Sequence, residues 1–256
     1  MTEGTKSTIQ TILKQAVANN DMEKIRDMVA SQGPDVYVHS KYRHTLLHQA
    51  CALGKTGIVR LLIEKGANVN ITNMSLATPL HMACFCGHTD IVRLLMEAGA
   101  DIEMDDVNGL TPFDDICISK GDVFGPAYEE ICDLLLSRGF DINRISPGSG
   151  RANLGEACRN GNVAVARFLL SHGANPELED TLGHSPLDYL VNGWCRKSHE
   201  MKNMLVLFRD RFPGLTLESI VKLPPDDPVR EWILDWYRQY HPEMVMEAFC
   251  SPGPIK

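Results

Sequence analysis

The chain has 256 residues, of which 44% are hydrophobic, and 33 acidic against 25 basic side chains give a formal net charge of −8. A nucleic-acid partner or an anionic membrane surface requires a basic footprint, so this balance argues against both. It leaves a basic protein partner open. No run of about 18 apolar residues is present, so the sequence predicts no membrane-spanning helix.

The cysteines and the start of the chain bear on the compartment. Residues 1–7 are polar and lack an apolar signal region. Most of the 8 cysteines fall where a helix face needs a small apolar side chain, a common role of buried free cysteine. A reducing compartment is the consistent interpretation. We therefore expect a monomeric cytoplasmic or nuclear protein.

Two short phrases recur about every 33 residues and set the organisation of the chain. The first is clearest as Thr-Pro-Leu-His-Met-Ala at residues 78–83. It returns in weaker form from residues 45, 111, 152 and 185. The second phrase, Gly-Ala-Asn or a close variant, lies at residues 66–68, 99–101, 139–141 and 173–175. A fixed period of this size is typical of a stacked repeat protein.

In chain order, residues 8–40 form a degenerate first unit, and each later unit predicts two helices. The first helix begins at a proline, which suits the first helical turn, and ends at a glycine such as Gly87, which accepts positive φ. The second helix has apolar residues at three- and four-residue spacing, as in residues 91–95. In that helix we expect Leu94 to be buried between neighbouring helix pairs.

These residues resemble the ankyrin-repeat family, whose consensus joins a Thr-Pro-Leu-His phrase, an apolar second helix and a Gly-Ala-Asp/Asn turn. Residues 78–103 match it almost throughout, and the resemblance covers roughly residues 8–210. It implies an all-α ankyrin-repeat solenoid of about six helix pairs over residues 1–212, with atypical end units. Residues 213–256 would then be a C-terminal helical cap or docking extension.

The spacing is irregular in the middle of the array. The step from Gly99 to Gly139 is about seven residues longer than the others, and the extra residues fall around residues 119–127, between the two helices of one unit. A surface loop tolerates lengthening at little entropic cost, so a neutral insertion is the leading interpretation. A functional loop is the alternative, since loops often carry function.

The C-terminal region leaves the repeat register. Residues 228–240 predict a helix with an aromatic face, because Trp232, Trp236 and Tyr240 recur at four-residue spacing. Covering the exposed end of the array is the favoured interpretation, since every solenoid needs its ends covered. The alternative is a second docking element, because Trp and Tyr are common interface anchors.

Residues 207–209 and 223–225 faintly resemble a suppressor-of-cytokine-signalling box, which recruits a ubiquitin ligase through elongins. Phe208 stands where that box has a small residue, usually Cys, and would overfill the pocket that receives it. A ubiquitin-ligase adaptor therefore remains an alternative function.

No enzyme signature is present, and we expect no catalysis, no metal and no cofactor. The resemblance implies that His48 and His81 hydrogen-bond the backbone of neighbouring turns, a role that other units manage without a histidine. Cys84, Cys86 and His88 lack the second ligand pair that zinc sites have. The Gly-Ser-Gly-Arg stretch at residues 148–151 follows no predicted strand, so it is a weak candidate for a phosphate loop.

The resemblance implies non-enzymatic binding of a partner protein on the concave face, built from turn tips and first helices. Transferring those positions gives the predicted partner-binding residues Tyr42, His44, Gln49, Leu53, Leu76, Met82, Phe85, Asp105, Asp106, Leu110, Asp115, Ile118, Arg151, Glu156, Arg159, Glu179, Asp180, His184 and Tyr189. This surface would be apolar near Leu76 and Phe85 and acidic from Asp105 to Asp115. We expect a partner with an apolar anchor and basic flanks.

Overall fold

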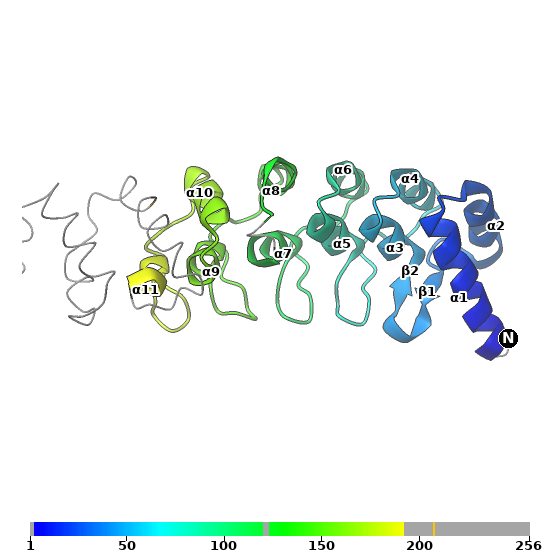
Figure 1. Ribbon diagram of the computed structural model, residues 1–256, viewed down its shortest axis with the longest axis horizontal. Coiled ribbons are helices and arrows are strands. Elements are labelled where there is room, and N and C mark those ends of the chain that lie inside the picture. Colours follow the sequence, from blue (N-terminus) through cyan, green and yellow to red (C-terminus); the bar gives the residue numbers. More distant parts are fainter. Residues whose placement is uncertain (1–2, 120–122, 192–206, 208–256) are drawn as a thin grey trace, which may run out of the picture. The chain divides into compact units, whose positions relative to one another are not determined.

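The computed structural model describes residues 3–119, 123–191 and 207 (Figure 1). The chain divides into two compact units, residues 1–150 and 151–256, called here the N-terminal and C-terminal units. The predicted segment 213–256, its aromatic helix and the box-like residues other than Leu207 lie outside the described residues.

The N-terminal unit is a row of helix pairs in two layers, with loops projecting on the side of the first helices (Figure 1). The first helices are α1 (Glu3–Ala18), α3 (Leu46–Ala52), α5 (Pro79–Cys86) and α7 (Pro112–Ser119). The second helices are α2 (Met22–Gln32), α4 (Thr56–Glu64), α6 (Thr89–Glu97) and α8 (Pro126–Ser137).

A short antiparallel hairpin precedes α3. It consists of β1 (Tyr37–His39), the 3-10 turn η1 (Ser40–Tyr42) and β2 (His44–Thr45). Tyr37 lies opposite Thr45 and His39 opposite His44 in its register.

The C-terminal unit repeats the same arrangement on a smaller scale. Its helices are α9 (Asn153–Asn160), α10 (Val163–Ser171) and α11 (Pro186–Val191). α9 packs against both α10 and α11. The predominantly helical fold expected from the two repeated phrases is therefore confirmed in both units.

The helix boundaries follow the predicted proline and glycine positions. α5 begins at Pro79 and ends at Gly87, whose φ of 73° is left-handed. Gly161, with φ of 68°, ends α9 in the same way. α7 ends at Ser119 and α8 begins at Pro126, so the insertion lies between the two helices of one unit, as predicted.

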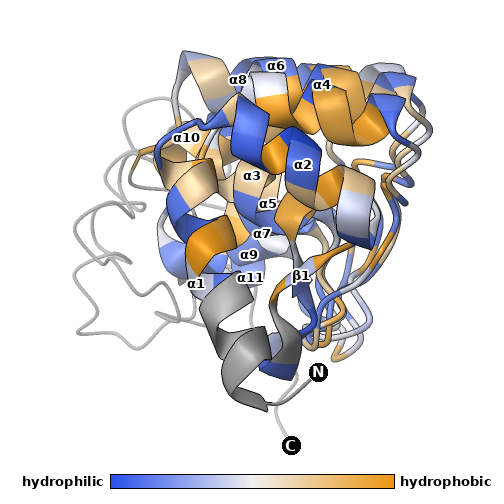
Figure 2. Ribbon diagram, turned by 90° about the vertical axis from the view of Figure 1, so that its right-hand side faces the viewer, coloured by the Kyte–Doolittle hydropathy of each residue, from blue (hydrophilic) through white to orange (hydrophobic). Residues whose placement is uncertain are grey.

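Equivalent positions of successive first helices fill the core. Cys51, Cys84 and Cys117, each 33 residues apart, are fully buried, which confirms that they occupy small apolar positions. Burial raises the pKa of all three thiols, so they stay protonated. Figure 2 shows that α4 is mainly hydrophobic, whereas α2 is largely hydrophilic, as an end unit requires.

One packing prediction is wrong in detail. Leu95 is fully buried, whereas Leu94 is only partly buried. Both leucines satisfy the three- and four-residue spacing from Ile91, so the pattern alone does not decide between them. The helix turns by about 100° per residue, and its rotation in the structure places Ile91 and Leu95 toward the neighbouring helices.

Leu95→Ala should therefore lower the free energy of unfolding by ~2–5 kcal/mol, the usual cost of a large cavity in a core. The loss should spread to adjacent units, because repeats stabilise each other. Leu94→Ala is the matched control and should cost clearly less. Urea unfolding monitored by circular dichroism measures both. Equal losses would contradict the orientation of α6 that places Leu95, rather than Leu94, in the core.

Candidate functional site

Two buried histidines connect neighbouring repeats within the N-terminal unit. The Nε2–H of His48 donates to the carbonyl of Ala77 (3.0 Å), and that of His81 donates to the carbonyl of Leu110 (3.0 Å). Carbonyl oxygens only accept, so Nε2 carries the proton in both rings. Nδ1 of His81 accepts the backbone N–H of Thr78 (3.1 Å). The predicted structural role of these histidines is confirmed.

An ion-pair network replaces the histidine in the next unit. Asp114, at the histidine position and 1% exposed, accepts the backbone N–H of Thr111 (2.9 Å) and pairs with Arg144 (3.1 Å). The other Nη of Arg144 pairs with Asp105 (2.6 Å). The predicted acidic residue Asp105 is therefore held by a cation of its own chain.

Arg151 connects several predicted residues of the C-terminal unit. It pairs with Glu156 (3.0 Å), and its Nε donates to the hydroxyl of Tyr189 (2.7 Å). That hydroxyl donates in turn to Asp180, and desolvation together with this hydrogen bond raises the pKa of Tyr189. Glu156 and Tyr189 are buried. These residues lie together, as an internally bonded cluster.

The remaining predicted residues of this unit lie around that cluster. Arg159 is partly buried, with its guanidinium 3.5 Å from Glu156. His184 is partly buried beside Asp180, at 3.7 Å, and Glu179 is exposed.

Loops project beside the first helices of the N-terminal unit (Figure 1). We name them finger 1, finger 2 and finger 3, for residues 40–44, 73–77 and 106–110. In finger 3, Oδ1 of Asp106 accepts the backbone N–H groups of Asn108 (2.7 Å) and Leu110 (3.0 Å). Asn73 plays the same role in finger 2. Asp106, predicted as an acidic tip, thus shapes its own turn.

The fingers differ at one backbone position. Gly109 in finger 3 has φ of 71°, and Gly183 holds the same place in the C-terminal unit, with φ of 79°. Finger 1 has Arg43 there (φ 50°) and finger 2 has Leu76 (φ 56°). The left-handed region costs a residue with a Cβ about 1–2 kcal/mol relative to its usual conformation. Fingers 1 and 2 are therefore locally strained.

Hydrophobic side chains are exposed on the fingers and at the ends of the first helices. Tyr42 (54%), Leu76 (48%) and Phe85 (40%) were predicted as partner-binding residues, as was Leu53, and all four are exposed. Met82, Leu110, Asp115 and Ile118 are partly buried on the same elements. We call this surface, formed by fingers 1–3 and the first helices α3, α5 and α7, the finger face.

The partner-binding residues predicted from the ankyrin resemblance do not include Met74 and Val107, which are exposed at the same place in fingers 2 and 3. The signal that would have found them is their 33-residue separation combined with apolar character. A groove of about 370 Å³ also lies on the finger face. It is lined by Tyr42, His44, Gln49, Ala52 and Leu53, of which all but Ala52 were predicted.

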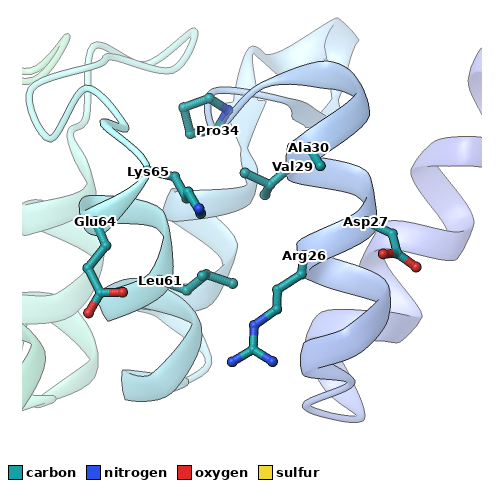
Figure 3. Close-up of a pocket in the computed structure, with 8 residues that line it drawn as sticks. All are labelled: Arg26, Asp27, Val29, Ala30, Pro34, Leu61, Glu64 and Lys65. Carbon is teal, nitrogen blue, oxygen red and sulfur yellow. The ribbon is translucent and has the colours of Figure 1, made fainter.

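A second pocket, of about 540 Å³, lies between the second helices α2 and α4 (Figure 3). Arg26 and Lys65 point into it, whereas Asp27 and Glu64 point away. The helices α2 and α4 lie on the side of the unit opposite the projecting loops (Figure 1). No residue of the predicted site lines it.

The stretch at residues 146–148 packs against finger 3. Oγ of Ser146 donates to the carbonyl of Gly109 (2.7 Å), and a Cβ built on Gly148 would lie 1.4 Å from the carbonyl oxygen of Asn108. The glycine therefore serves close backbone packing.

Within residues 3–119, 123–191 and 207, no three His, Cys, Asp or Glu side chains are grouped to hold a metal ion, and no helix could cross a membrane.

Stacked helix pairs with projecting fingers define a repeat protein. Two family profiles match, ankyrin repeats in three copies over residues 13–106 and ankyrin repeats in many copies over residues 125–176. Together they cover more than half of the chain, which belongs to the ankyrin-repeat family. Ankyrin repeats indicate a protein–protein interaction module, and proteins of this fold are typically non-catalytic.

Relatives of known structure or name agree with this assignment. The chain is similar to the solved ankyrin repeat domain of Bcl-3, of the IkappaB protein family, with a TM-score of 0.64 and 26% identity over 77% of this chain and 84% of that chain. It is 35% identical to human ARF GTPase-activating protein GIT2 over 77 residues, which are 30% of this chain and 10% of GIT2.

A third relative is the ankyrin repeat and KH domain-containing protein mask-1 of Caenorhabditis elegans. It is 39% identical over 61 residues, which are 24% of this chain and 2% of mask-1. The chain therefore spans a tenth or less of the length of these two named relatives.

Protonation of the buried histidines should destabilise the fold. Burial lowers the pKa of His48 to about 4, and it also lowers the pKa of His81. The unfolded chain binds these protons near pH 6.5, so stability is fully present above that pH and is lost as the pH falls toward 4. For His48 the loss is up to about 3 kcal/mol. Urea unfolding at several pH values should show that His48→Gln loses less free energy of unfolding than the wild type as the pH falls. The same pH dependence in both proteins would contradict this role of His48.

Arg144→Met should cost about 3 kcal/mol, because it leaves the buried carboxylate of Asp114 without its cation. The matched control is Arg93→Met, which breaks an exposed pair with Glu130 and should cost under about 1 kcal/mol. Adding Asp114→Asn to Arg144→Met should recover part of the loss, because the buried charge is then removed. Thermal unfolding measures all three, and equal losses for the two arginine variants would refute the network's role.

Proposed function

We propose that this chain binds a partner protein through its finger face. The observation that carries the proposal is the location of its exposed hydrophobic side chains. Of the nine large hydrophobic residues exposed in the described part of the chain, six lie on fingers 1–3 or at the ends of α3 and α5. Clustered exposed apolar residues of this kind mark interaction sites, whereas scattered ones do not.

The finger face is also well suited to hold anchors in place. The N–H of Met74 donates to the carbonyl of Tyr42 (2.9 Å), and the N–H of Val107 donates to the carbonyl of Ser75 (2.8 Å). Neighbouring fingers therefore brace each other through backbone hydrogen bonds. A preorganised surface loses less conformational entropy on binding, which favours affinity.

The predicted residues of the C-terminal unit contribute differently. Arg151, Glu156 and Tyr189 satisfy one another and are mostly buried, so they are poor candidates for anchors. We assign them to shaping the surface of that unit, and we assign the docking energy to Tyr42, Leu76 and Phe85 on the finger face. A few large desolvated side chains usually dominate an interface.

Phe85→Ala should weaken binding by ~2 kcal/mol, roughly thirtyfold in Kd, if this side chain is an anchor. Partners are recovered from cell extract by affinity capture with the full chain, and their affinity is measured with purified proteins. Leu182→Ala is the matched control, since Leu182 is 70% exposed on a loop of the C-terminal unit. Unchanged affinity for Phe85→Ala would move the docking site elsewhere. Recovery of elongins would favour the adaptor alternative.

A further inference from the structure

Two exposed residues of fingers 1 and 2 keep a strained backbone that the fold does not require. Arg43 and Leu76 are left-handed where Gly109 and Gly183 serve the equivalent turns. Both side chains are exposed, so packing in the core does not offset the strain at either residue. Strain retained at an exposed turn is an outlier that points to a role for the side chains themselves.

The charged side chains within fingers 1 and 2 are Lys41 and Arg43, and both are cationic. Nζ of Lys41 lies 5.5 Å from the centre of the Tyr42 ring, and Arg43 follows in the chain. No ion pair among the described residues involves Lys41 or Arg43. Lys41 therefore lies beside the apolar groove that Tyr42 lines, and Arg43 stands between the lining residues Tyr42 and His44 in the chain.

The carboxylates at and beside finger 3 have partners within the chain. Asp105 pairs with Arg144 at 2.6 Å, and Asp106 accepts two backbone N–H groups of its own turn. Backbone N–H groups leave the charge of Asp106 in place, and Arg144 offsets only one of the two negative charges of Asp105 and Asp114, so the region of finger 3 stays acidic. The cationic part of the finger face is finger 1, beside the apolar groove, so a segment that docks in that groove meets positive charge rather than the acidic residues from which basic flanks were expected.

We infer that the partner segment carries a bulky apolar side chain flanked by carboxylates. The apolar side chain enters the groove beside Tyr42 and Leu53, and Lys41 and Arg43 receive the flanking Asp or Glu side chains. Leu76 of the adjacent finger covers the apolar group. This inference rests on the proposed function and specifies the chemistry that the same surface recognises.

Three synthetic peptide sets test the inference by fluorescence anisotropy with the full chain. All carry the same central Leu, Phe or Trp, and their flanks are Asp/Glu, Lys/Arg or Ser/Asn. The acidic-flanked set should bind at least about tenfold tighter than the basic-flanked set, and the preference should fall as salt rises. The chain has a net charge of −8, so nonspecific attraction would favour the basic set instead.

Charge-reversal variants locate the site. Lys41→Glu with Arg43→Glu should weaken binding of the acidic-flanked set at least about tenfold. The matched control, Arg26→Glu with Lys65→Glu, makes the same charge change in the pocket between α2 and α4 and should leave binding unchanged. Loss with the control pair but not with the finger 1 pair would overturn the inference.

Leu76→Gly separates binding from folding. Glycine adopts positive φ without strain, so the unfolding midpoint should not fall, while binding of the acidic-flanked set should weaken at least about fivefold. A lower midpoint with unchanged binding would show that Leu76 serves the fold and would overturn the inference.

The outcomes separate the inference from the proposed function. If the chain prefers the basic-flanked set, the inferred acidic chemistry of the partner is overturned. If that binding is lost with Phe85→Ala, the result still supports the finger face as the docking surface. Absence of binding by the acidic-flanked set would overturn the inference alone. A natural partner indifferent to both Phe85→Ala and Leu76→Gly would overturn the proposed function as well.

Discussion

The hydrogen bond from a buried histidine to a carbonyl in the following unit is the constraint on which the N-terminal unit depends. In each case it links the start of one first helix to the finger that precedes the next, as from His81 to Leu110. The same ring accepts the N–H of Thr78 at the start of its own helix. One side chain therefore fixes both the beginning of a helix and the position of the next finger. Since the fingers carry the exposed apolar residues, the binding surface inherits its geometry from this buried contact.

The connection changes its chemistry along the chain. The early units use neutral histidines, whereas Asp114 and Arg144 make the equivalent connection as a partly buried ion pair. In the C-terminal unit Arg151 pairs with Glu156 and lies 3.7 Å from Asp180. Ion pairs need good geometry to offset desolvation, so these units depend more on exact side-chain placement than the histidine units do. The irregular spacing in the middle of the chain accompanies this change.

The sequence predicted the helix boundaries because single residues determine them locally. A proline begins α5 and Gly87 ends it, and neither choice depends on distant parts of the chain. Leu94 and Leu95 could not be told apart, because that choice depends on the rotation of α6 against its neighbours. The pairing of Asp105 with Arg144 joins residues 39 positions apart, and no local pattern reports it. The strain at Leu76 becomes visible only when its φ is compared with that of Gly109.

The column of buried cysteines gives the N-terminal unit a set of built-in reporters. Cys51, Cys84 and Cys117 occupy equivalent places in successive first helices, and none is reachable by solvent in the folded state. A thiol reagent can reach each one only when its own unit opens. The rate at which each cysteine is modified therefore measures the local opening free energy of that unit. The molecule carries, without any engineering, a unit-by-unit record of where its array separates first.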